Sequence, residues 1–255
     1  MTVPGTFDTS ARELIHAGLQ NLDEARSLFR QLSASGFDAA RCGLLLDALQ
    51  HVCDPDVALR NLVDIVNAQV SQGRALDDIM PDDTAFRQLV AVLGVSDAMG
   101  KLMRFRPDLV QAAATDHCNS HLYNHDQRRA HVLESVGADP NDRMSPTATM
   151  DLADAATALR RTYRNQLAAI IAQDTMSDDP IALQPRISSE LSDLADAALE
   201  GALAIARHEI TGSEHCRFAI IGMGKLGARE LNYVSDVDLI YVVKAADADT
   251  SQQQL

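Results

Sequence analysis

The sequence predicts a mainly helical protein that leads into the first part of an α/β domain. Apolar residues recur at helical spacing from about Ser10 to Ala113 and again from Leu152 to Ile205, without strand-like alternation. Aromatic residues make up only 4% of the 255 residues and Trp is absent, a composition that favours helices over sandwiches or barrels. Two apolar strand-like runs occur only between Phe218 and Val243, where they flank a glycine-rich turn.

The first helical block is expected to be a bundle of short helices. Its clearest helix begins after Asp54, whose side chain can accept hydrogen bonds from free backbone amides while Pro55 occupies the first helical position. The predicted buried stripe of this helix is Leu59, Leu62, Val63, Val66 and Val70. Asp83 is expected to cap a following helix, which Gly94 and Ser96 end.

The segment from Gly137 to Pro146 is rich in Gly, Pro, Asn and Asp and is predicted to be a loop. We therefore expect an N-terminal helical region over 1–136, the loop over 137–148, helices over 149–210, and the start of a catalytic domain over 211–255. Two long helices should fill the third region. The first would bury Leu152, Ala156, Leu159, Tyr163, Leu167 and Ile170, and the second, from about Ser189, would bury Leu191, Leu194, Ala195, Ala198, Ala202 and Ile205.

Charge and cysteine usage exclude several classes of protein. Lys and Arg total 22 against 36 Asp and Glu, and the net charge of −14 repels nucleic acid and anionic membranes. Cys42, Cys53, Cys118 and Cys216 form no CxxC pair, which argues against a disulfide framework or a zinc ribbon. The first residues show no basic segment followed by an apolar run, and no run of about 18 apolar residues occurs, so neither a secretory leader nor a membrane span is expected. The sequence predicts a cytoplasmic protein with reduced thiols, which binds neither nucleic acid nor membrane.

Two carboxylates, Asp236 and Asp238, stand one residue apart before the apolar run from Leu239 to Val243. On a strand, both would point to the same face at a spacing of about 7 Å. Such a pair is typical of a site for a hard cation such as Mg²⁺, because carboxylate oxygens are the ligands that this ion prefers. We therefore predict that the two aspartates are metal ligands.

Three other interpretations of the glycine turn compete with a metal-dependent site. Gly222, Gly224 and Gly227 spell GxGxxG, but only about eight residues separate the last glycine from Asp236, too few for the helix of a dinucleotide-binding unit in an oxidoreductase. A P-loop does not fit, because Lys225 is followed by Leu226. A purely structural turn stays open as an alternative. A nucleotidyltransferase site, with a glycine turn at the phosphates and an Asp-x-Asp pair at the metal, uses every unusual residue here.

The run GMGKLGARELNYVSDVDLIYV resembles the nucleotidyltransferase signature of the family that adenylylates and deadenylylates glutamine synthetase, a branch of the DNA polymerase beta superfamily. Three upstream segments are also similar to helices that precede the first catalytic domain in that family: LLLDALQHVCDPDVALRNL, LVAVLGVSDAMGKLM and SELSDLADAALEGALAIAR. The resemblance implies a mainly helical region leading into a partial polymerase-beta-like α/β domain, at the N-terminal quarter of a bifunctional enzyme.

The resemblance also implies an activity and a set of functional residues. The N-terminal catalytic domain of the family removes AMP from a tyrosine of glutamine synthetase by phosphorolysis and releases ADP, whereas the C-terminal domain adds AMP from ATP. Carried onto this chain, Asp236 and Asp238 are the catalytic Mg²⁺ ligands, and Gly224, Lys225 and Gly227 line the nucleotide phosphates with Ser235 beside the metal. The implied partners are glutamine synthetase, a P-II-type signal protein and glutamine as an effector.

The same comparison predicts an incomplete site. The family fold takes a third carboxylate from a later strand, and the sequence has only 17 residues after Asp238. We therefore expect a fragment that is inactive alone, with an open and apolar strand at its end. Lys225 as a solvated loop charge and the whole chain as a non-catalytic helical interaction module remain alternatives. Glu230 and Asn232 are expected to order the turn through hydrogen bonds.

One further group of residues could bind a metal. His117, His121 and His125 recur every four residues and would stack on one face if they lay on a single helix. No matching pair of ligands stands nearby in the sequence, so a polar, solvent-facing segment is the competing interpretation.

Overall fold

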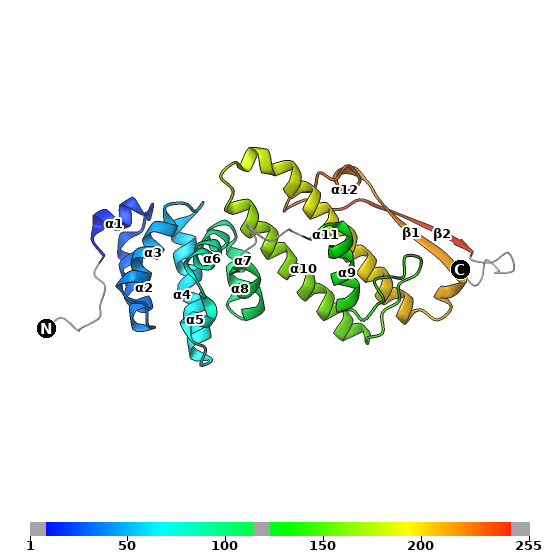
Figure 1. Cartoon of the computed structure of the whole chain (residues 1–255), viewed down its shortest axis with the longest axis horizontal. Coiled ribbons are helices and arrows are strands. Elements are labelled where there is room, and N and C mark those ends of the chain that lie inside the picture. The colour runs from blue at the N-terminus through cyan, green and yellow to red at the C-terminus, as the bar shows by residue number, and fades with distance from the viewer. Residues whose placement is uncertain (1–8, 115–122, 246–255) are drawn as a thin grey trace. The chain divides into compact units, whose positions relative to one another are not determined.

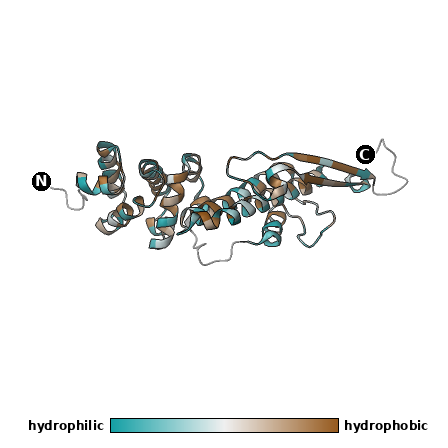
Figure 2. Cartoon of the chain, turned by 90° about the horizontal axis from the view of Figure 1, so that it is seen from above, coloured by the Kyte–Doolittle hydropathy of each residue, from teal (hydrophilic) through white to brown (hydrophobic). Residues whose placement is uncertain are grey.

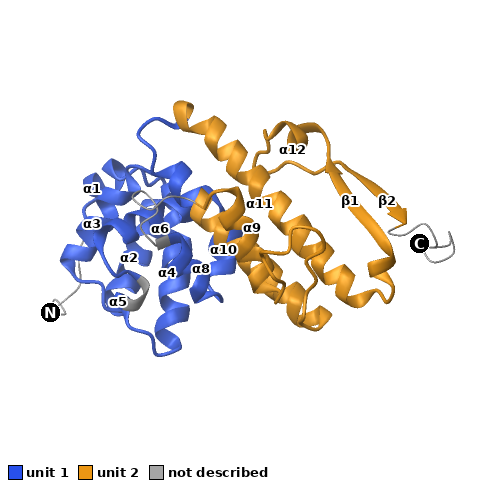
Figure 3. Ribbon diagram, turned by 45° about the vertical axis from the view of Figure 1, so that its right-hand side comes forward, with its two compact units in different colours: residues 1–120, 171–180 blue, residues 121–170, 181–255 orange. Residues whose placement is uncertain are grey.

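The structure, a computed structural model, describes residues 9–114 and 123–245 and divides the chain into two compact units. Unit 1 comprises residues 1–120 and 171–180, and unit 2 comprises residues 121–170 and 181–255 (Figure 3). The long helix α10 (Leu152–Thr175) therefore begins in unit 2 and ends in unit 1.

Unit 1 consists of short helices, as predicted (Figure 1). Its helices are α1 (Ala11–His16), α2 (Leu22–Ala34), α3 (Ala39–Leu49), α4 (Pro55–Ser71), α5 (Leu76–Ile79), α6 (Asp83–Val95), α7 (Asp97–Met103) and α8 (Pro107–Ala114). No strand occurs among the described residues of this unit. The predicted bundle of short helices is therefore confirmed.

Polar side chains set the beginnings of these helices. The side chain of Asp54 accepts a hydrogen bond from the Val57 amide at 2.9 Å, and Pro55 stands at the first helical position of α4, as predicted. The predicted cap of α6 is off by one residue, because Asp82 accepts from the Ala85 amide at 2.8 Å. Asp82 and Asp83 carry the same side chain, and the backbone conformation determines which of the two is the cap.

The core of unit 1 forms where α4 packs against α6 and α7. Asn61 on α4 is buried and donates to the carbonyl oxygen of Leu93 on α6 at 3.2 Å. Gly100 on α7 lies so close to Asn61 that a Cβ atom there would overlap its amide. Of the stripe predicted on α4, Leu59, Leu62, Val63 and Val66 are buried, but Val70 is 37% exposed. Val70 lies in the last turn of α4.

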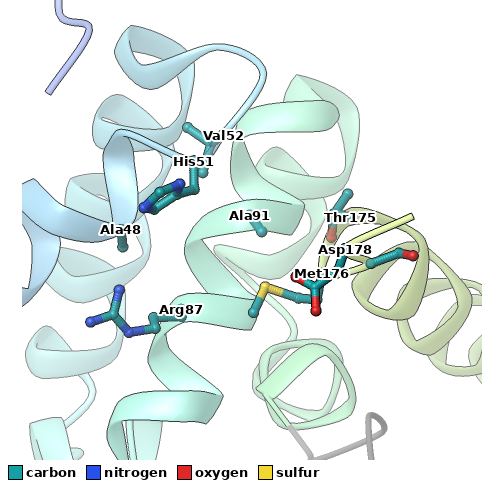
Figure 4. A pocket seen from close by; sticks show the side chains of 9 residues that line it. Ala48, His51, Val52, Arg87, Ala91, Thr175, Met176 and Asp178 are labelled. Carbon is teal, nitrogen blue, oxygen red and sulfur yellow. The ribbon is translucent and has the colours of Figure 1, made fainter. Parts of the chain in front are cut away.

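The segment after α10 closes a hollow in unit 1. Figure 4 shows Arg87 and His51 on one side of it and Met176 and Asp178 on the other. The hollow has a volume of about 310 Å³. Arg87 is already paired with Asp47, so this guanidinium is part of the scaffold of unit 1.

Unit 2 is built on three helices and a two-stranded sheet. The helices are α9 (His125–Ser135), the first part of α10 and α11 (Pro180–Glu209), followed by a 3₁₀ turn at Ser213–His215. Then come β1 (Cys216–Gly222), the short helix α12 (Gly224–Ala228) and β2 (Leu239–Ala245). No helix or strand occurs between Ser135 and Leu152, the segment that contains the predicted loop over 137–148.

Two arginines on α9 hold unit 2 together. Arg128 is 1% exposed, pairs with Glu190 on α11, and donates to Gln166 Oε1 on α10 at 2.8 Å. Arg129 makes two 2.7 Å hydrogen bonds to the Glu200 carboxylate and also donates to the carbonyl oxygens of Pro140 and Asp142. Charged groups that are buried need such partners, because desolvation of an unpaired ion costs several kcal/mol.

The prediction for α11 is only partly correct. This helix begins at Pro180, nine residues before the predicted start, and Pro185 lies inside it. Pro185 has no amide hydrogen to donate to the carbonyl oxygen of Ile181, one turn earlier, and Ile181 is 86% exposed. Ala202, predicted to face inward, is exposed; it lines an apolar groove of about 490 Å³ between α11 and the sheet.

Strands β1 and β2 pair in antiparallel fashion, with Ala219 opposite Val242 and Ile221 opposite Ile240. Both strands are strongly apolar (Figure 2). Ile221, Ile240 and Val242 are each 45–48% exposed on one face. Within the described residues β2 pairs with β1 alone, which confirms the prediction of an open strand with exposed apolar side chains.

Candidate nucleotide and metal site

The glycine turn connects β1 to α12 and depends on two close backbone approaches. Gly224, the first residue of α12, has φ +54°, a value that L-residues with side chains seldom adopt. A Cβ atom on Gly227 would lie 2.6 Å from the carbonyl oxygen of Gly222. The turn therefore requires glycine at these two positions, for different reasons.

Asp238 lies against this turn. Its carbonyl oxygen accepts a hydrogen bond from the Met223 amide at 2.8 Å. Its carboxylate oxygen Oδ2 is 3.3 Å from the position that a Cβ atom of Gly224 would occupy. The structure thus places one of the predicted carboxylates beside the predicted phosphate turn.

Asp236 and Asp238 are both exposed and precede β2, which begins at Leu239. The prediction that they lie on the strand itself is therefore wrong, since Asp238 directly precedes β2 and Asp236 stands two residues earlier. Lys225 is exposed as well. In the described ranges, no group of three close His, Cys, Asp or Glu side chains includes either aspartate.

Asn232 and Ser235 close the connection that leads to the two aspartates. The Ser235 hydroxyl donates to Asn232 Oδ1 at 2.9 Å and accepts from the Asn232 amide at 3.2 Å. Asn232 Oδ1 also accepts from the Val234 amide at 3.1 Å. The prediction that Asn232 orders the turn is confirmed, and Ser235 takes part in the same small network.

The turn is anchored on α11 by apolar and polar contacts. Leu226 and Leu231 are buried in a cluster with Ile187, Leu191 and Leu194 of that helix. Arg229, at the end of α12, forms an ion pair with Asp193 at 2.7 Å and donates to Ser189 Oγ at 2.6 Å. The hydrogen bond to Asp193 raises the pKa of the Arg229 guanidinium. Sequence reasoning missed this contact, because it joins residues 36 and 40 positions apart.

Comparison with known proteins identifies the family of this chain. The family model for glutamate-ammonia ligase adenylyltransferase matches residues 86–254, which include most of α6, the helices α7 to α11, the glycine turn and both aspartates. The chain belongs to this family.

Individual members of the adenylyltransferase family match almost the whole chain. A bifunctional glutamine synthetase adenylyltransferase/adenylyl-removing enzyme from Bifidobacterium longum is 67% identical over 249 residues, covering 98% of this chain and 23% of the relative. Proteins of the same name from Cutibacterium acnes and Leifsonia xyli are 32% and 36% identical and cover 94% and 92% of the chain, and 24% and 23% of their own lengths. The chain thus spans about a quarter of the length of these relatives.

A second group of potential ligands lies near the anchor of this adenylyltransferase-family chain. His125, Asp193 and Asp196 bring their ligand atoms within 4.8 Å of one another. The pKa of Asp196 is raised, mainly by burial, while His125 lowers it and Asp193 raises it. Asp193 is paired with Arg229, which already balances part of the negative charge.

Of the three histidines considered as a possible metal-binding face, the structure describes His125. Helix α9 begins at His125, and Asn124 before it is extended and caps the helix through its side chain. His117 and His121 lie outside the described residues.

Across the described residues, no helix combines the length and apolar character needed to cross a membrane.

Proposed function

We propose that this chain carries the helical region and the first catalytic elements of a polymerase-beta-type nucleotidyltransferase domain. The observation that carries the proposal is the contact between the glycine turn and Asp238, supported by the family match over both. In this proposal the missing side chain of Gly224 leaves room for phosphate groups close to the backbone beside Asp238, whereas Gly227 lets α12 close against Gly222. In this proposal the metal meets those phosphates at the Asp238 carboxylate, with Asp236 as its second ligand.

Asp236 and Asp238 are the proposed Mg²⁺ ligands. Their carboxylates are exposed and offer oxygen atoms, which suit a hard cation. When bound, Mg²⁺ neutralises charge on the phosphoryl oxygens during in-line displacement. In this proposal Gly224, Lys225 and Gly227 line the phosphates of ATP or ADP, and Ser235 stands beside the metal ligands.

The proposed reaction is the deadenylylation of glutamine synthetase. An oxygen of inorganic phosphate forms a bond to the phosphorus of tyrosine-bound AMP as the bond to the tyrosine oxygen breaks, which yields ADP and free tyrosine. The relatives are named as adenylyl-removing as well as adenylyltransferase enzymes, which supports an activity of this class. A P-II-type signal protein and glutamine as effectors, and a cytoplasmic location, complete the proposal on the strength of the family resemblance.

The test is substitution of each carboxylate in the full-length enzyme. We expect Asp236→Asn and Asp238→Asn to lower ADP release from adenylylated glutamine synthetase by about 10³-fold or more, because the metal would lose a ligand. Adenylylation from ATP, assigned to the other catalytic domain, should persist. Glu214→Gln is the matched control, since this exposed acid lies before β1, at the end opposite to the turn.

The outcomes separate catalysis from a helical interaction module. Unchanged ADP release in both aspartate variants would overturn the catalytic proposal, whereas lost release with intact binding of glutamine synthetase supports it. We also propose that the 255-residue chain alone neither adds nor removes AMP at a useful rate. Robust deadenylylation by the isolated chain would contradict this.

A further inference from the structure

Arg229 has an unusual backbone conformation for its residue type. It ends α12 with φ 60° and ψ 40°, in the left-handed region, and it is the only non-glycine residue with positive φ in the described ranges. This conformation is energetically unfavourable for residues with a Cβ atom, so glycine is the common residue at such a helix end. An arginine at this position indicates that its side chain has a structural or functional role.

The side chain of Arg229 reaches two residues on one face of α11. Ser189 and Asp193 are four positions apart and therefore neighbours on the helix surface. Nη2 donates to Ser189 Oγ at 2.6 Å, and Nη1 lies 2.7 Å from Asp193 Oδ1. Asp193 is 8% exposed, so the ion pair is partly shielded from water.

A second bond fastens the chain two residues further on. The amide of Leu231 donates to Ser192 Oγ at 3.4 Å, and that hydroxyl donates to the Ser188 carbonyl oxygen. The segment after α12 is thus held on α11 on both sides of Glu230, whose own amide returns to the Lys225 carbonyl oxygen at 2.8 Å.

These contacts lead directly back to the aspartates. Leu226 fixes α12 in the apolar cluster, and the amide of Gly227 bonds the Met223 carbonyl oxygen at 3.2 Å. Met223 in turn holds the backbone of Asp238. Any rotation of α12 on α11 would therefore move the glycine turn and, through Met223, change the position of Asp238.

We propose that Arg229 is a positioning residue for the metal-binding carboxylates: its fork on Ser189 and Asp193 locks the glycine turn onto α11. The inference rests on the proposed function of Asp236 and Asp238. Arg229 itself touches neither substrate nor metal. Its effect is to keep the carboxylates and the turn in one arrangement before the nucleotide binds.

The test uses the full-length enzyme and Arg229→Gly, which removes the side chain while favouring the left-handed backbone. We expect kcat for deadenylylation to fall about 10-fold to 100-fold and the half-saturating Mg²⁺ concentration to rise, as for groups that orient metal ligands. The KM for adenylylated glutamine synthetase should stay within about twofold. Arg217→Gln, an exposed arginine on β1, is the control and should behave as the wild type.

Variants of the residues that Arg229 contacts distinguish a positioning role from a folding defect. Asp193→Asn should lose activity like Arg229→Gly, and the double variant should lose no more than either single one, because both remove the same contact. Ser189→Ala removes one arm of the fork and should give a smaller loss. Thermal unfolding of each variant shows whether the fold is retained.

Each outcome of these experiments either supports or overturns the positioning role of Arg229. Wild-type kcat and Mg²⁺ dependence in Arg229→Gly, a loss confined to KM, or additive losses in the double variant would overturn the positioning role. Asp236→Asn belongs in the same series: if it is inactive while Arg229→Gly is fully active, only this inference fails. If Asp236→Asn is active, the proposed function fails and the inference fails with it.

Discussion

The amide of Met223 donates to the carbonyl oxygen of Asp238 at 2.8 Å, directly after the last pair of the sheet, Gly222 and Leu239. The ladder between β1 and β2 is thereby extended by one bond, into the glycine turn on one side and into the Asp-x-Asp run on the other. Asp238 is held by backbone pairing, although its carboxylate is exposed. This leaves the carboxylate oxygens available while the main chain beneath them is fixed.

Gly227→Ala should loosen α12. The new methyl group would lie 2.6 Å from the Gly222 carbonyl oxygen, so the turn must shift, at a cost of about 1–3 kcal/mol. The amides of Gly227, Arg229 and Glu230, which bond within the turn, should then exchange their hydrogens about 10-fold to 100-fold faster. Hydrogen exchange resolved by residue measures this.

Gly43→Ala is the control for that substitution. Gly43 is exposed on α3 and has no atom within 4 Å of its added methyl group, so alanine there should stabilise the helix by about 0.5–1 kcal/mol. Exchange in α12 should not change. Equal exchange rates in the wild type and Gly227→Ala would refute the close-approach argument.

Glu190→Ala should strongly destabilise unit 2. It leaves Arg128, 1% exposed, without its carboxylate, and breaking one side of a buried pair costs about 3–5 kcal/mol. Glu190→Gln, which keeps an oxygen acceptor, should cost less. Urea denaturation followed by circular dichroism gives the free energies of unfolding.

The contrasting pair is on the surface of α2. Asp23 pairs with Arg26 at 3.4 Å but its side chain is 98% exposed, so Asp23→Ala should change stability by less than about 1 kcal/mol. Similar losses for the buried and the exposed pair would show that burial does not set the cost here.

Asp196→Asn should stabilise the protein near neutral pH. Burial, with the nearby Asp193, raises the pKa of Asp196 above its ordinary value of 3.8, while His125 and Arg229 oppose the shift. In the pH window from 3.8 up to the raised pKa, the folded state binds more protons than the unfolded state, so this group destabilises the fold as pH rises through that window.

The measurement is the melting temperature of wild type and Asp196→Asn between pH 4 and 7. The difference in favour of the variant should grow with rising pH and level off above the raised pKa of Asp196. A difference that does not depend on pH would argue against the titration of this carboxyl group.

Val242→Lys should reduce self-association of the 255-residue chain. Ile221, Ile240 and Val242 leave the outer face of the sheet apolar, and a strand edge beside such a face favours pairing between chains. Light scattering after gel filtration at several concentrations tests this. Met144→Lys, at an isolated residue that is 79% exposed, should leave the association as it is; a monomeric wild type at all concentrations would contradict the prediction.

Much of the fold followed from local chemistry that the sequence displays. The Asp54–Pro55 start of α4, the loop around 137–148 and the strands on either side of the glycine turn all depend on residues that are adjacent or one helical turn apart. The start of α11 did not follow, because Ser189 resembles a cap and Pro185 resembles a break. Solvent exposure of the first turns allows the helix to contain that proline.

The sequence supplied candidate residues for the site but not the contacts that support them. Spacing alone singled out the glycines and the two aspartates. The contact of Arg229 with Asp193 and Ser189 arises only when α12 docks on α11, and acids are too common in this chain to reveal which of them a given arginine meets. The position of His125 beside Asp193 and Asp196 could not be predicted either, because no periodicity in the sequence indicates it.

The path of α10 has a consequence for dissecting this protein. The chain passes from unit 1 into unit 2 near residue 120, returns to unit 1 for residues 171–180, and enters unit 2 again. No single proteolytic cut or truncation point therefore separates the two units. Expression of residues 121–255 would include residues 171–180, which belong to unit 1, without Ala48, His51 and Arg87, which line the hollow that this segment closes. The two units must therefore be studied together or re-joined in a circularly permuted chain.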